Sequence, residues 1–218
     1  MNSRLARLFR GLGLCVLGLS VSSVTLASVV FSNFGAGRVY DINNGNAVGN
    51  GFDGSVYMQG SSFTPGANAV FGSLEIALSV AGSQSAPVTI SLMADAGNLP
   101  GATMESWLLG PGSLGLLGVN NTPITLTSAL GLTFLFGTEY WVTASAGNAD
   151  DAVAWNWNSI GDINDTAINQ DGGGWWGPSG FTPGAFQVDS ADTTVPEPAT
   201  LALVGLALSG LGLSRRKQ

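Results

Sequence analysis

The residue types that could do chemistry in the central part of this chain are carboxylates, hydroxyls, amides and tryptophans. The 218-residue sequence has no histidine, and its single cysteine, Cys15, and single lysine, Lys217, lie near the two ends. Serine–histidine and cysteine–histidine catalysis, lysine bases and thiolate or imidazole metal sites therefore lack their residues in the body of the protein. The same composition excludes a phosphate-binding P-loop, which requires lysine.

Hydrolysis of glycosides requires only two carboxylates, roughly 5–9.5 Å apart, so the lack of His, Cys and Lys does not exclude it. The glutamates available are Glu75, Glu105 and Glu139. Glu75 and Glu139 lie on the polar phase of alternating segments, where we expect them to face solvent. Because no spacing marks an acid–base pair, the sequence predicts a protein that is not an enzyme.

Oxygen-rich loops offer a weak indication of calcium binding. Acidic and amide side chains gather at residues 148–151 and 162–171. The second stretch begins like an EF-hand loop, but Ala167 stands where that loop requires glycine and Gly173 where it requires glutamate. Asx-turns in a solvated loop explain the same residues. We therefore predict no cofactor, with a looser calcium site in these loops as the alternative.

The tryptophans are the most suggestive side chains of the body. Trp155 and Trp157 alternate with asparagines, and their shared parity favours burial of both in the core. Trp175 and Trp176 follow three glycines in what the sequence indicates is a loop. Exposed tryptophans near Asn and Asp can stack on sugar rings, so Trp175 and Trp176 form a candidate glycan-binding site, with packing as the alternative.

The elements that must position these residues are β-strands. Apolar and polar residues alternate with period two at 74–80, 88–92, 124–127 and 140–145. The intervening turns are rich in glycine and asparagine, and no part of the body shows a helical period. We therefore predict an all-β domain over residues 28–190, an antiparallel β-sandwich of jelly-roll type.

The N-terminal end has the character of a secretory signal peptide. Arg4, Arg7 and Arg10 precede an apolar run, and Thr25-Leu26-Ala27 supplies small residues for cleavage by signal peptidase after Ala27. Residues 1–27 are accordingly predicted to be a signal peptide with a helical core. The alternative, an N-terminal transmembrane helix, conflicts with the short apolar run and its polar exit.

The C-terminal end combines a short motif, an apolar segment and a basic cluster. Residues 191–198 form a linker that ends in Val195-Pro196-Glu197-Pro198, and residues 199–218 contain a hydrophobic segment followed by Arg215, Arg216 and Lys217. The segment is predicted to be a transmembrane helix whose basic tail stays in the cytoplasm. Its apolar part, 199–213, rises ~22 Å against a hydrocarbon core of ~30 Å, which suits temporary retention better than a permanent anchor, the alternative.

Charge and cysteine content limit the partners of the body. Between the two ends the chain has one basic residue, Arg38, and thirteen acidic residues, a formal net charge of −12. DNA and RNA are therefore excluded as partners, because binding phosphates requires Lys and Arg. The body also lacks cysteine, so core burial rather than disulfide bonds must hold it together.

The C-terminal pattern closely resembles the PEP-CTERM sorting signal of Gram-negative bacteria. The resemblance implies an exported protein that passes through the inner membrane and is processed there by an exosortase, a transpeptidase-like membrane enzyme. Delivery to the cell surface or the extracellular matrix would follow.

The body resembles the choice-of-anchor R domain found in such surface proteins. The resemblance extends from about residue 33 to 190 and includes Ser62-Phe63-Thr64-Pro65, Asn98-Leu99-Pro100-Gly101 and Thr138-Glu139-Tyr140-Trp141. It implies an extracellular domain and supplies neither an activity nor catalytic residues. Two hypotheses follow: a non-enzymatic surface or matrix protein, or alternatively a carbohydrate-binding module in the exopolysaccharide matrix.

Overall fold

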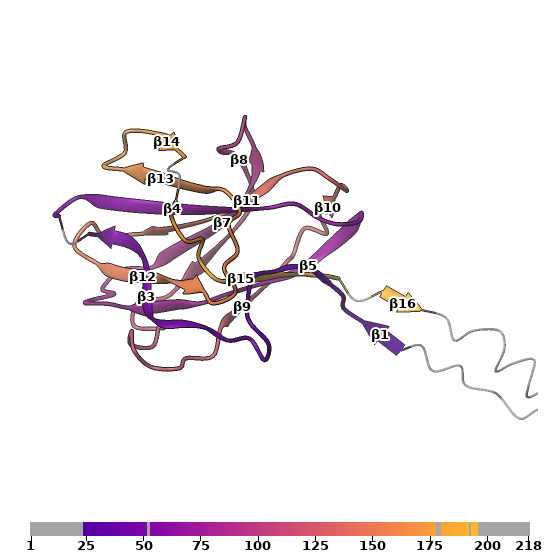
Figure 1. Ribbon diagram of the computed structural model, residues 1–218, viewed down its shortest axis with the longest axis horizontal. Helices are drawn as coiled ribbons and strands as arrows, with labels where there is room; N and C mark the ends of the chain where they lie inside the picture. The colour runs from indigo at the N-terminus through magenta and orange to yellow at the C-terminus, as the bar shows by residue number, and fades with distance from the viewer. Residues whose placement is uncertain (1–23, 52, 178–179, 192, 196–218) are drawn as a thin grey trace, which may run out of the picture. The chain divides into compact units, whose positions relative to one another are not determined.

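The computed structural model describes residues 24–51, 53–177, 180–191 and 193–195, which fall into two compact units. In one unit, β1 (Val24–Leu26) pairs with β16 (Thr193–Val195) as a two-stranded sheet. The other unit, Ala27–Thr193, contains all the remaining strands (Figure 1). The helices predicted within 1–27 and 199–218 lie outside the described residues. Within 1–27 the structure describes only Val24–Leu26, which form a strand, and Ala27. No membrane-spanning helix occurs in the part of the chain that the structure describes.

The smaller sheet of the main unit has five strands. The order begins β2–β15–β5, and both β9 and β10 pair with the remaining edge of β5 at different positions along it. All of these pairings are antiparallel. The strands are β2 (Val29–Ser32), β5 (Ala69–Ile76), β9 (Ile124–Thr127), β10 (Thr133–Phe134) and β15 (Phe186–Ser190).

The larger sheet has nine strands in the order β6–β12–β3–β4–β11–β7–β8, with β13 paired to both β4 and β14. It branches at β4, which pairs with β3 at Val56 and Tyr57, with β13 from Tyr57 to Ser61, and with β11 from Gln59 to Phe63. The strands are β3 (Tyr40–Asn50), β4 (Val56–Phe63), β6 (Leu78–Val80), β7 (Val88–Asp95), β8 (Pro100–Leu109), β11 (Tyr140–Ala146), β12 (Ala152–Asn158), β13 (Thr166–Gln170) and β14 (Trp175–Trp176).

The prediction of an all-β, antiparallel, sandwich-like domain is confirmed. The four alternating segments coincide with β5 and β6, β7, β9 and β11. The predicted turn residues also take the backbone conformations that turns require: Gly97 and Asn98 have φ of 76° and 62°, and Gly112 has 66°. Glycine and asparagine tolerate this left-handed region, so these residues end the strands for a conformational reason.

An aromatic cluster forms the centre of the core. The ring of Phe63 lies between 5.3 and 5.9 Å, centroid to centroid, from four other rings, which belong to Phe31, Phe134, Tyr140 and Phe186. Trp155 is fully buried and makes an edge contact with Phe186 at 6.0 Å. Such ring pairs add about 0.5–1.5 kcal/mol each beyond the burial of their surface, which suits a body without disulfide bonds.

The polar phase of residues 74–80 is buried as well, contrary to the prediction that it faces solvent. Glu75 is 6% exposed and Ser79 is 0% exposed. The Ser79 hydroxyl donates a hydrogen bond to Oδ1 of Asn156 on the neighbouring strand, at 2.7 Å. The alternation correctly assigned residues to the two faces of these strands. It did not reveal that other segments cover the face that carries Glu75 and Ser79.

Candidate functional site

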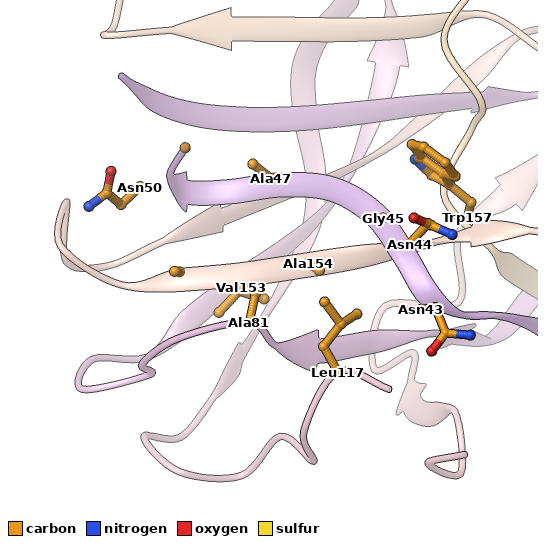
Figure 2. Close-up of a pocket in the computed structure, with 12 residues that line it drawn as sticks. Asn43, Asn44, Gly45, Ala47, Asn50, Ala81, Leu117, Val153, Ala154 and Trp157 are labelled. Carbon is orange, nitrogen blue, oxygen red and sulfur yellow. The ribbon is translucent and has the colours of Figure 1, made fainter. Parts of the chain in front are cut away.

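A groove beside β3 and β12 is the candidate binding site of the main unit (Figure 2). Its volume of about 530 Å³ lies within the range of ligand pockets, roughly 300–1,000 Å³. Polar groups come from Asn43, Asn44 and Asn50, and the rest of the lining is largely apolar, including Leu117 and Trp157. All lining residues are described, and none of them is Asp, Glu, Lys or Arg.

The indole of Trp157 is held in place by a short chain of hydrogen bonds. Its Nε1 donates to Oδ1 of Asn46 at 2.9 Å, and Nδ2 of Asn46 donates to the Thr182 carbonyl at 2.9 Å. Figure 2 places Trp157 and Asn44 close together near one end of the groove and Asn50 near the other. The Trp157 ring therefore has a fixed orientation without any ligand.

Asn43 and Asn44 are positioned by a turn at Asp41. One carboxylate oxygen of Asp41 accepts hydrogen bonds from the backbone amides of Asn43 and Asn44, at 2.9 and 3.1 Å. The other accepts from Nδ2 of Asn44, at 2.9 Å. This Asx-type turn interrupts the pairing of β3 with β12 and presents the asparagines to the groove.

Gly45 permits the close approach of β3 to β12 beside the groove. A Cβ atom built at this position would lie 2.6 Å from the carbonyl oxygen of Trp155. Any other residue would have to displace one of the two strands, because the contact is with backbone rather than with a flexible side chain.

Trp157 corrects one sequence-based prediction. Its partner in the pattern, Trp155, is buried as expected, but Trp157 is only half-buried and lines the groove. The reason is a register shift between Asn156 and Asn158, where β3 contributes extra residues opposite β12. A bulge of this kind re-aims side chains and cannot be read from alternation within one strand.

Trp175 and Trp176, the candidate glycan-binding pair, lie in β14 rather than in a loop. Trp175 pairs with Asn169 and Trp176 with Ile168, so the two rings occupy opposite faces of the β13–β14 hairpin. Trp176 is 47% exposed and Trp175 is half-buried. The structure therefore does not bring them together on one face, and neither lines the groove.

Glu75 makes an ion pair with the only cation of the body, Arg38. The Arg38 guanidinium lies 2.9 Å from Oε1 of Glu75, the Thr125 side chain also interacts with the carboxyl, and Oε2 is buried. Burial raises the pKa of the Glu75 carboxyl, and Asp189 adds to this, while Arg38 opposes it. The Glu75 carboxylate is thus covered and neutralised rather than exposed to solvent as predicted.

Arg38→Gly is expected to destabilise the protein by about 1–3 kcal/mol at pH 7, because a buried carboxylate loses its partner. Glycine is the suitable replacement since Arg38 has φ of 64°. Because the pKa of Glu75 is raised in the folded state, protonation favours folding. The loss should therefore shrink as the pH falls from 7 toward the ordinary glutamate value of 4.5.

Urea unfolding of the wild type and of Arg38→Gly across this pH range measures the effect. Arg38→Lys, which keeps the charge, serves as the control. When Glu75→Gln is present in both proteins, the stability lost through Arg38→Gly should no longer depend on pH. A loss of the same size at pH 7 and pH 4.5 would contradict the assignment to Glu75.

The other two glutamates do not form an acid–base pair with Glu75 in the described contacts. Glu105 is buried and accepts hydrogen bonds from the Ser128 hydroxyl at 2.8 Å and the Ala129 amide at 2.7 Å. Glu139 precedes β11 instead of lying within a strand, and burial raises the pKa of its half-buried carboxyl. Asp95 and Asp165 lie close to the Glu139 carboxyl and add to this rise in its pKa, whereas Glu105 is held by residues of the 128–129 loop.

The oxygen-rich loops have structural contacts of their own. Asp151 is buried, and the backbone amides of Ser85 and Ala86 donate to its carboxylate at 2.7 and 2.9 Å, which lowers its pKa. Asp162 accepts a hydrogen bond from Nδ2 of Asn33 at 3.0 Å. Among the described residues no three acidic, histidine or cysteine side chains come together around a metal position. The prediction of no cofactor, with a looser calcium site as the alternative, stays a prediction.

Comparison with known proteins identifies the C-terminal tail. A family model described as the PEP-CTERM protein-sorting motif matches residues 194–217, which include Val195-Pro196-Glu197-Pro198 and the basic cluster Arg215, Arg216 and Lys217. The predicted sorting signal is thereby confirmed. The motif implies an exported, surface-associated protein that an exosortase processes at the membrane. No curated protein matches the chain.

The groove residues themselves were not found from the sequence. The segment 41–50 is unusually rich in asparagine and glycine, and this composition was the available signal. This composition does not distinguish a binding site from an ordinary turn, because Asn and Gly are common in both.

Proposed function

We propose that this chain is a non-enzymatic surface or extracellular-matrix protein of a Gram-negative bacterium. The observation that carries the proposal is the sorting motif at residues 194–217, which follows a compact β unit at Ala27–Thr193. The tail would direct delivery, and the β unit would be the part delivered. The acidic body fits this role, since net negative charge favours solubility outside the cell.

The proposed route has two processing steps. Signal peptidase would remove residues 1–27 by cutting after Ala27, and an exosortase would act on the tail after passage through the inner membrane. The delivered domain, residues 28–190, would be of the choice-of-anchor R type, which rests on the sequence resemblance described above.

The surroundings of three carboxylates, Glu75, Glu105 and Asp151, support a non-enzymatic role. Glu75 is paired with Arg38, Glu105 accepts two hydrogen bonds, and Asp151 binds two backbone amides. These groups stabilise the fold and are covered by the side chains and loops that they hold. A glycosidase would instead present two carboxyl groups to one cleft.

Mass spectrometry of the protein isolated from its native cell tests the proposal. The expected product lacks residues 1–27 and has lost the hydrophobic part of the tail. An intact C-terminus in the membrane fraction would instead indicate a simple anchor. Recovery of the complete chain from the cytosol would overturn the proposed export altogether.

Glycan binding in the exopolysaccharide matrix is the second candidate function. At the predicted pair, Trp175 and Trp176, the observation that favours glycan binding is the 47% exposure of Trp176. Because Trp175 and Trp176 occupy opposite faces of their hairpin, one ring at most could contact a given sugar there.

A further inference from the structure

We propose that the groove beside β3 and β12 binds a neutral glycan chain, with Trp157 stacking on a sugar ring and Asn43, Asn44 and Asn50 binding its hydroxyl groups. The inference rests on the proposed function, because it supplies the partner that a matrix protein would hold. It places the site away from Trp175 and Trp176, neither of which lines this groove.

The chemistry of the lining selects the class of ligand. A pyranose ring has apolar C–H faces and a periphery of hydroxyl groups, so it needs a flat apolar surface beside neutral donors and acceptors. Trp157 and Leu117 supply apolar surface, and the asparagine side chains carry both donors and acceptors. A volume of about 530 Å³ is suited to a short segment of a chain.

Charge argues against an ionic ligand. The lining contains no charged side chain, and the body has a formal net charge of −12. An anionic polymer would be repelled by this field, and a cation would find no carboxylate in the lining. A neutral glycan meets neither obstacle.

Strand pairing argues against a bound peptide. Peptides commonly bind to β proteins by adding a strand to an open edge. β12 pairs with β3 on one side and with β6 on the other, so its edges are already occupied. A ligand beside β12 therefore cannot be held by strand addition there, which leaves side-chain contacts and suits a saccharide.

The binding groups are ordered before any ligand arrives. Trp157 is fixed through Asn46, and Asn44 is fixed through Asp41. Nδ2 of Asn44 is occupied by Asp41, which leaves Oδ1 of Asn44 as an acceptor for a hydroxyl group. Asn43 and Asn50 are exposed, so their amides can also reach a ligand. Pre-ordering of this kind lowers the entropic cost of binding.

Calorimetric titration of the purified full chain in detergent tests the inference. The probes are the extracellular polysaccharide of the producing cells, separated into neutral and acidic fractions, and a panel of neutral glucan, mannan, galactan and xylan oligosaccharides. We expect binding of a neutral glycan, weakened about tenfold or more by Trp157→Ala. Trp157→Phe, which keeps an aromatic face, should lose less, and Trp176→Ala should bind like the wild type.

Ala81→Trp provides a second variant that keeps Trp157 in place. Ala81 is exposed and lines the groove, so a large side chain there should block the site without removing core packing. An unchanged unfolding midpoint with binding weakened about tenfold would support the inference. Absence of any neutral-glycan binding, binding of the acidic fraction alone, or wild-type binding by both Trp157→Ala and Ala81→Trp would overturn it.

Tail processing in the same cells separates this inference from the proposed function. If Trp157→Ala is processed normally but loses glycan binding, the groove assignment and the surface-protein proposal are both supported. If glycan binding fails in the wild type while the tail is still removed, the groove assignment fails and the surface-protein proposal stands.

Discussion

Replacing Pro196, Glu197 and Pro198 together with alanine is expected to slow removal of the C-terminal segment by about a hundredfold or more. The physical reason is that an enzyme site built to read a polar group loses much of its discrimination when that group is missing and its own polar atoms are left unpaired. These residues lie within the matched sorting motif. Pulse–chase labelling followed by mass spectrometry of the C-terminus measures the rate.

The unprocessed variant should accumulate in the inner-membrane fraction, because it retains the hydrophobic part of residues 199–218. Asp192→Ala is the matched control: it removes a neighbouring carboxylate outside the matched residues 194–217 and should be processed like the wild type. Processing of the triple variant at the normal rate would show that recognition does not depend on Pro196–Pro198.

Trp155→Ala is expected to destabilise the main unit by about 3–5 kcal/mol, the usual cost of truncating a buried aromatic residue. The ring is fully buried, packs against Phe186, and donates a hydrogen bond from Nε1 to the Ala185 carbonyl at 3.1 Å. Such a loss is a large part of the stability of an ordinary domain. Urea unfolding followed by the fluorescence of the remaining tryptophans measures it.

Trp155→Phe should cost less, since it keeps an aromatic ring and loses the hydrogen bond and part of the packing. A matched glycine pair tests the same contact from the other side. A Cβ at Gly184 would lie 2.3 Å from Nε1 of Trp155, whereas nothing lies within 4 Å of a Cβ at Gly66. Gly184→Ala should therefore destabilise and Gly66→Ala should not. Equal stability of both alanine variants would contradict the placement of Trp155.

The two glycines occupy the same position in a repeated pentapeptide, Phe-Thr-Pro-Gly-Ala, at 63–67 and 181–185. Phe63 is 1% exposed, whereas Phe181 is 50% exposed. Identical local sequences therefore have different environments and different local structure: residues 66 and 67 form a bend, whereas Gly184 forms a bridge with Trp157.

Much of the architecture followed from the sequence, because it depends on local chemistry. Period-two alternation located β7, β9 and β11, and glycine and asparagine located the turns between strands. The sorting motif at residues 194–217 was equally accessible, since a contiguous stretch of chain carries it. Absence of histidine and scarcity of cations likewise excluded whole classes of chemistry by composition alone.

The candidate site depended instead on contacts between distant segments. Glu75 was expected to face solvent, but the fold buries it and brings Arg38, 37 positions away in the chain, to its carboxylate. Trp157 lines the groove because β3 bulges opposite β12. Trp175 and Trp176 lie on opposite faces because pairing with β13 places both in one strand, where successive side chains alternate. Local propensity fixed strands and turns, whereas register and side-chain cover arise only when the sheets assemble.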